Sequence, residues 1–143
     1  MNPLNHGLQY RMRRAARQMG EQHAQLAQIL AELGPAITER RQGDARALFE
    51  RYRDAIEAHF SLEEDVFFPA LHGLHPEHAS ELELLGHEHA GLKAQIERLG
   101  GLLERDFAAF GAGVSALVQA LANHEGREER LARALVGGSA PVD

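Results

Sequence analysis

Apolar side chains recur at alternating steps of three and four residues in four segments of this chain, residues 12–33, 48–66, 82–103 and 110–135. This spacing places them along one face of an α-helix, and such a face is stable only when it packs against other helices. The segments are rich in Ala, Leu, Glu, Arg and Gln, which favour helices, and they contain no run of alternating β-branched residues. The sequence therefore predicts an all-α protein.

Turns rich in glycine, proline and histidine separate the four segments, at residues 34–44, 72–76 and 105–106. Connections this short join antiparallel neighbours, so we expect an up-down-up-down four-helix bundle with helices of roughly 25 residues each. Pro69 lies in the last turns of the second predicted helix, and His72-Gly73 follow as its cap. A chain of 143 residues has the size of one domain. We expect a single domain over residues 1–143, with a bundle core over about residues 8–136 and a frayed tail at 137–143.

The amino-acid composition excludes several classes of partner and of metal ligand. Asp and Glu outnumber Lys and Arg by 21 to 15, so the chain lacks the basic surface that holds nucleic acid. No apolar run approaches the roughly 18 residues of a membrane-spanning helix. The four arginines among residues 1–17 are not followed by the apolar segment of a secretory signal. Cysteine is absent, which excludes disulfides and thiolate ligands. We expect a cytoplasmic protein without nucleic-acid or membrane partners.

Polar residues interrupt the predicted apolar faces at matching places. Each of the four faces carries one histidine, and in the second and fourth a glutamate follows that histidine by four residues, which places both on one side of the helix. An unsatisfied polar group inside a bundle costs roughly 1–3 kcal/mol, and a charged carboxylate costs more. Four imidazoles and two carboxylates from four helices suit two divalent first-row metal ions. The predicted metal ligands are His23, His59, Glu63, His89, His124 and Glu128.

The same histidines mark an internal repeat. His59 follows His23 by 36 residues, and His124 follows His89 by 35. Residues 59–64, with the sequence HFSLEE, correspond to residues 124–129, with the sequence HEGREE. Each half of the chain would therefore donate two imidazoles and one carboxylate, and the repeat predicts a similar ligand set for each of two metal ions.

With these residues the chain resembles the hemerythrin-like HHE cation-binding family over about residues 18–135. Its most specific piece is residues 59–69, HFSLEEDVFFP, which resembles the family pattern of a histidine, three residues, paired acids and a Phe-Pro end to the second helix. The resemblance implies a four-helix bundle around a non-haem di-iron centre with an oxo or hydroxo bridge. It further implies use in binding O2, in nitric oxide or peroxide chemistry, in sensing, or in iron handling, with the six residues above as ligands.

One departure from the family pattern bears on function. Oxygen-carrying hemerythrins have a fifth histidine, with two on the third helix four residues apart. Here Leu85 lies four residues before His89, and Gly91 lies four residues after His87. His87 is about 200° around the helix from His89 and is predicted to face outward or toward the edge of a neighbouring helix. The set of four histidines and two glutamates is more similar to the bacterial branch associated with stress response, nitric oxide and iron–sulfur cluster repair.

For the other polar and aromatic residues near the predicted ligands, the first interpretation is a structural or surface role. Tyr52 either packs in the core or hydrogen-bonds a bound ligand, and the phenylalanines either wall the site or fill the bundle end. The three turn histidines are interpreted as loop residues and the N-terminal arginines as a solvated face. Solvated surface charges are predicted for Glu64, Glu88, Glu125 and Glu129, with coordination of a metal ion by Glu64 or Glu129 as the alternative. The phenylalanines are Phe60, Phe67 and Phe68, and the turn histidines are His72, His75 and His78.

Three functional hypotheses follow. In the first, a di-iron protein binds or senses O2, NO or peroxide, because six protein ligands cannot fill the roughly twelve positions of two six-coordinate ions. In the second, the protein is an oxidoreductase or an iron donor in nitrosative or oxidative stress and iron–sulfur cluster repair. In the third, zinc stabilises a structural or dimerisation bundle, which is colourless and unfolds on chelation. The sequence decides neither whether the protein is an enzyme nor whether it forms a homodimer. A zinc-protease motif is absent, since Glu128 stands where the second histidine of His-Glu-x-x-His belongs.

Overall fold

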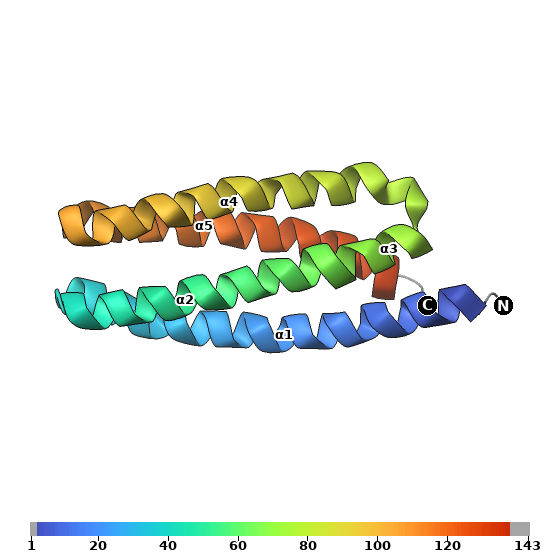
Figure 1. Ribbon diagram of the computed structural model, residues 1–143, viewed down its shortest axis with the longest axis horizontal. Coiled ribbons are helices and arrows are strands. Elements are labelled where there is room, and N and C mark those ends of the chain that lie inside the picture. The colour runs from blue at the N-terminus through green and yellow to red at the C-terminus, as the bar shows by residue number, and fades with distance from the viewer. Residues whose placement is uncertain (1–2, 138–143) are drawn as a thin grey trace.

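Four helical rods run antiparallel along one long axis (Figure 1). The computed structural model describes residues 3–137. The first rod is α1 (Pro3–Thr38), and the second is continuous through α2 (Gln42–Leu62), the π-helical turn η1 (Glu63–Phe67) and α3 (Phe68–Leu74). After the short 3-10 turn η2 (Pro76–His78), the third rod is α4 (Ala79–Arg105). The fourth is α5 (Phe107–Ala132), followed by the π-helical turn η3 (Arg133–Gly137).

The predicted all-α, up-down-up-down bundle is confirmed. Figure 1 shows α1 beside α2 and α4 beside α5, with the chain reversing direction at each short connection. Of the predicted frayed tail, Gly137 lies within η3, and residues 138–143 fall outside the described residues. Within the described range 3–137, no helix is both long enough and apolar enough for a membrane crossing.

The first helix is longer than the sequence predicted. Gly34-Pro35 does not end it, because the helix continues to Thr38 and has 36 residues. Pro35 removes one backbone donor, but the backbone of the last turn stays paired, since the Glu39 N–H donates to the Pro35 carbonyl at 2.9 Å. The Thr38 hydroxyl donates to the Gly34 carbonyl at 3.1 Å. The turn itself is made by Arg40, whose φ of 58° lies in the left-handed region that ends many helices.

A π-helical turn in the second rod lies directly before Pro69. Proline lacks the N–H of the normal helical ladder, and its ring clashes with the carbonyl four residues earlier. The wider turn accommodates this, and the N–H of Phe68 donates to the carbonyl of Glu63, five residues before it. Single π turns of this kind are frequent at functional sites. The rod then continues to Leu74, which agrees with the predicted end at residues 72–73 to within two residues.

The apolar core consists of two clusters along the bundle. The larger includes Phe49, Leu99 and Phe110 and lies toward the α1–α2 and α4–α5 connections, and the smaller packs Met12 and Leu71 near α3. In α4 all seven predicted seam positions are buried. In α1 the predicted positions Ala16 and Leu30 are only half-buried, and their neighbours Ala15 and Ile29 are buried instead.

The core predicts a stability effect that is separate from any metal chemistry. Leu99 is 1% exposed in the larger cluster, so Leu99→Ala removes buried methyl groups and leaves a cavity. We expect it to lower the free energy of unfolding by about 2–5 kcal/mol in urea titrations. The half-exposed Val118 on α5 serves as the control, since Val118→Ala should change stability by less than about 0.5 kcal/mol. Equal effects of the two substitutions would contradict this core assignment.

Candidate metal centre

The structure brings all six predicted site residues together inside the bundle. Five of them are buried, and His23 is the exception, with 38% of its side chain exposed. Every rod contributes, so the site links all four. The contributions are His23 from α1, His59 from α2, Glu63 from η1, His89 from α4, and His124 and Glu128 from α5.

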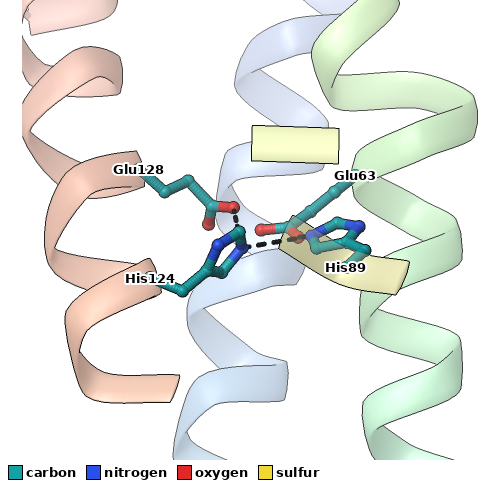
Figure 2. Close-up of side chains that lie close together, drawn as sticks. All are labelled: Glu63, His89, His124 and Glu128. Carbon is teal, nitrogen blue, oxygen red and sulfur yellow. Dashed lines mark hydrogen bonds and ion pairs between the residues drawn. The ribbon is translucent and has the colours of Figure 1, made fainter. Parts of the chain in front are cut away.

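The four histidines form two close pairs. Nε2 of His23 lies 3.1 Å from Nε2 of His59, and Nε2 of His89 lies 3.1 Å from Nε2 of His124. Figure 2 shows the second pair, in which the two rings approach one another from α4 and α5. The pairing repeats in both halves of the chain, as the internal sequence repeat predicts.

Hydrogen bonds on the outer side of the rings determine which nitrogen carries the proton. Nδ1 of His89 lies 2.6 Å from Oε2 of Glu64, and Nδ1 of His124 lies 2.6 Å from Oε1 of Glu88. An ionised carboxylate only accepts hydrogen bonds, so both Nδ1 atoms donate. In neutral imidazoles the two Nε2 atoms are then unprotonated, and their lone pairs face one another at 3.1 Å. A cation between them would relieve this repulsion.

Glu63 has the least compensated side chain of the site. Its Oε2 lies 3.3 Å from Nε2 of His59, and its Oε1 lies 2.9 Å from Nε2 of His89. It is fully buried, yet within the described part of the chain neither oxygen makes a hydrogen bond, and the same holds for Oε2 of Glu128. Such orphaned groups cost roughly 1–3 kcal/mol each, and more when charged. Imidazole nitrogens and carboxylate oxygens aimed at one another fit a bound metal cation.

The donor atoms divide into two groups, each with all its atoms within 4.8 Å. The first group is entirely buried and consists of Glu63, His89, His124 and Glu128. The second group consists of His23, His59 and Glu125, and only His59 is buried. Since one oxygen of Glu63 faces His59 and the other faces His89, this carboxylate lies between the two groups.

The two buried glutamates titrate in opposite directions in the metal-free site. Burial, together with the nearby Glu63 carboxylate, raises the pKa of Glu128 to about 11. Burial also acts to raise the pKa of Glu63, but a proton on His59, His89 or Glu128 that faces the carboxylate outweighs this and holds the pKa well below the usual range. In the metal-free site such protons take the place that a cation would occupy.

Aromatic rings enclose the first group. Phe60 stacks on His89 with the ring centroids 4.0 Å apart and the planes 15° apart. Phe68 stacks on the same ring at 5.8 Å and 25°. These contacts fix the orientation of His89 and keep water from it. Phe60 and Phe68 therefore form a wall of the site, which is one of the two roles predicted for them.

Two predicted surface charges have a different role. Glu64 is exposed as predicted and Glu88 is partly exposed, but each accepts a hydrogen bond from a buried histidine. Arg127 lies 2.8 Å from Glu88. Burial acts to raise the pKa of Glu88, but its contacts with Arg127 and His124 outweigh this and lower the pKa. Glu129, by contrast, is 75% exposed as predicted and pairs with Arg133.

Sequence reasoning also missed Gln22. Its Oε1 lies 2.9 Å from Nδ1 of His59 and accepts the hydrogen bond that Glu88 accepts in the other half. Gln22 and Glu88 each immediately precede the first histidine of their half. The internal repeat thus contained a signal that could have identified both residues.

The remaining predicted positions lie where ordinary roles place them. His6 and His87 are exposed, as are the four arginines at positions 11, 13, 14 and 17. His72 is exposed but lies in the last turn of α3, not in a loop as predicted. Beyond α3, His75 lies 3.1 Å from the Leu135 carbonyl, and His78 lies 2.8 Å from Glu81. Tyr52 is buried in the larger core cluster, where burial, with Glu125 nearby, raises its pKa.

The shifted pKa of Glu128 predicts a pH dependence. Because the folded pKa of about 11 lies above the ordinary value of 4.5, folding takes up a proton, and this contribution to stability is lost as pH rises between those two values. The metal-free protein should lose about 1 kcal/mol of unfolding free energy per pH unit between about pH 7 and 9. Urea unfolding with chelator present should show a clearly smaller slope for Glu128→Gln. Parallel slopes would contradict a protonated Glu128.

The family comparison agrees with this geometry. The model of the Hemerythrin HHE cation binding domain matches residues 14–136, which is most of the chain. No curated protein and no solved structure matches the chain. The resemblance found over residues 18–135 is therefore confirmed, and a cation-binding family agrees with two groups of His and Glu donors, one buried and one partly exposed, that could hold metal. The chain belongs to the hemerythrin HHE cation binding domain family.

Proposed function

We propose that this protein holds two iron ions in the bundle core and there binds a small exogenous ligand, O2, NO or peroxide. The observation that carries the proposal is the buried Glu63 carboxylate, which lies unpaired between two imidazole pairs whose nitrogens face one another at 3.1 Å. Two cations, one at each pair, would compensate the carboxylate and separate the facing lone pairs.

The donor set supports iron over harder or softer ions. Imidazole nitrogen suits Fe, Zn, Cu and Ni, and additional carboxylates favour an ion that accepts both nitrogen and oxygen ligands. His89, His124 and Glu128 would hold one ion, His23 and His59 the other, and Glu63 would reach both. When bound, iron would supply redox chemistry and open positions for a small ligand, since the protein ligands do not fill about twelve positions.

The surrounding side chains prepare the site for this role. Glu64, Glu88 and Gln22 hold the Nδ1 protons, so the Nε2 lone pairs point inward before any ion arrives. The Phe60 and Phe68 rings exclude water from His89. A cavity of about 480 Å³ between α1 and α5 reaches His23 and Glu128, and it gives small molecules a route to the site.

The second candidate function is iron donation or oxidoreductase chemistry in stress response and iron–sulfur cluster repair. The observation that favours it is the exposure of His23, because an ion held at the bundle surface exchanges more readily than one in a closed core. Catalytic consumption of NO or peroxide, or transfer of iron to a metal-free cluster protein, would support this function over simple binding.

Iron stoichiometry tests the proposed site. The metal-free protein loaded anaerobically with ferrous iron should retain about two ions per chain after desalting. Glu63→Ala should lower iron retention strongly, because it removes the carboxylate that faces both imidazole pairs. Glu104→Ala is the matched control, since this exposed glutamate pairs with Arg46 away from the site and should leave retention unchanged. Circular dichroism confirms that the variants are folded. Equal retention by all three proteins would contradict the proposal.

The response to air separates the functions. After air is admitted, we expect new near-ultraviolet and visible absorption from ferric iron and its ligands. Bands that disappear on deoxygenation indicate reversible O2 binding despite the missing fifth histidine. Irreversible change to a ferric spectrum indicates oxidant, NO or iron-handling chemistry. A colourless protein that retains zinc, rejects iron and unfolds with chelator would instead support the structural zinc hypothesis.

A further inference from the structure

Each of the four histidines contacts a side chain from a neighbouring helix, and together these contacts run around the bundle. His59 bonds to Gln22, His89 to Glu64 and His124 to Glu88, in each case through Nδ1. His23 completes the circle with Glu125 of α5, but here the contact is different. Oε2 of Glu125 lies 3.7 Å from Nε2 of His23, the same nitrogen that faces His59. Glu125 therefore lies on the inner, metal-facing side of its histidine.

The internal repeat explains how this difference arises. Glu125 directly follows His124, just as Phe60 directly follows His59. Phe60 stacks on His89, the first histidine of the other half, whereas Glu125 faces His23, the corresponding histidine. One half thus presents an aromatic ring where the other half presents a carboxylate.

A buried, unpaired oxygen points to a ligand at this second group. Oε2 of Glu63 lies 3.3 Å from Nε2 of His59, is buried, and makes no hydrogen bond within residues 3–137. The donor atoms of His23, His59 and Glu125 all lie within 4.8 Å of one another. Contacts of 3.1 and 3.7 Å between these donors match the spacing of ligands around one ion at the roughly 2.0–2.2 Å bond lengths of imidazole and carboxylate ligands.

The cavity between α1 and α5 ends at this group. Its lining includes Glu125, Glu129 and the small residues Gly20 and Gly126, which leave the space open. Side-chain exposure is 38% for His23 and 37% for Glu125, whereas the first group is entirely buried. An acidic, partly open approach of this kind favours the entry of a cation.

We propose that Glu125 is a protein ligand of the second cation position, together with His23 and His59, and that this position is the one that exchanges its ion through the α1–α5 cavity. The inference rests on the proposed two-ion function and deepens it. On this assignment the two positions are unequal, whereas the repeat predicts a similar ligand set for each ion. Glu125 also adds a third carboxylate to Glu63 and Glu128 against the four positive charges of two divalent ions.

Titration of the metal-free protein with Co²⁺ tests this assignment. Co²⁺ binds the same nitrogen and oxygen donors, and its visible absorption reports their number and geometry. We expect the wild-type protein to bind one Co²⁺ tightly and a second more weakly. Glu125→Gln should leave the first step unchanged and weaken the second by about 10-fold or more. Glu125→Phe, which places the residue of the other half at this position, should abolish the second step. Glu104→Gln, at an exposed acid that pairs with Arg46 outside this cavity, should behave as wild type.

The possible outcomes distinguish the role of Glu125 from the two-ion function. Two unchanged steps in Glu125→Gln would overturn the role of Glu125 and leave the two-ion site intact. Loss of both steps in a variant that circular dichroism shows to be folded would also overturn it, because Glu125 would then act on the whole site. A wild-type protein that binds fewer than two Co²⁺ ions would overturn the two-ion function itself.

Discussion

An unpaired carboxylate in the middle of a helical bundle is the constraint on which the rest of this structure depends. Glu63 is fully buried and lies within 3.3 Å of one imidazole and 2.9 Å of another, yet it makes no hydrogen bond among the described residues. An arrangement that is unfavourable without a cation becomes favourable with one. The free energy of metal binding and that of folding are therefore linked in this protein, and metal should stabilise the bundle.

The helices place this carboxylate and hold its surroundings. Glu63 begins the π-helical turn that accommodates Pro69, and four residues before it His59 faces the same interior. One apolar cluster lies on each side of the polar site, and the burial of these side chains offsets the destabilising effect of the buried charges. Hydrogen bonds that Nδ1 of His89 and Nδ1 of His124 donate to Glu64 and Glu88 keep the imidazole lone pairs turned inward. The site is thus prepared for a cation by residues that need not touch it.

Much of this architecture could be predicted from the sequence, because helical periodicity determines which side chains share a face. The seam of α4 and the convergence of six polar residues follow from that periodicity alone. The roles of Gln22, Glu64 and Glu88 depend on contacts between helices, which spacing within one helix does not specify. The sequence did not predict that α1 continues through Pro35. The backbone hydrogen bonds of the last helical turn outweigh the preference of Gly34-Pro35 for a turn. The two halves differ at corresponding positions of the repeat, Phe60 against Glu125 and Gln22 against Glu88, and helical spacing does not reveal what these side chains contact.

The central claim is that two metal ions lie on either side of Glu63. A crystal structure of the iron-loaded protein, with anomalous scattering measured at the iron absorption edge, tests it most directly. The account predicts two anomalous peaks, one between His89 and His124 and one between His23 and His59, with an oxygen of Glu63 directed at each. A single peak, or peaks only at the turn histidines His72, His75 and His78, would contradict it.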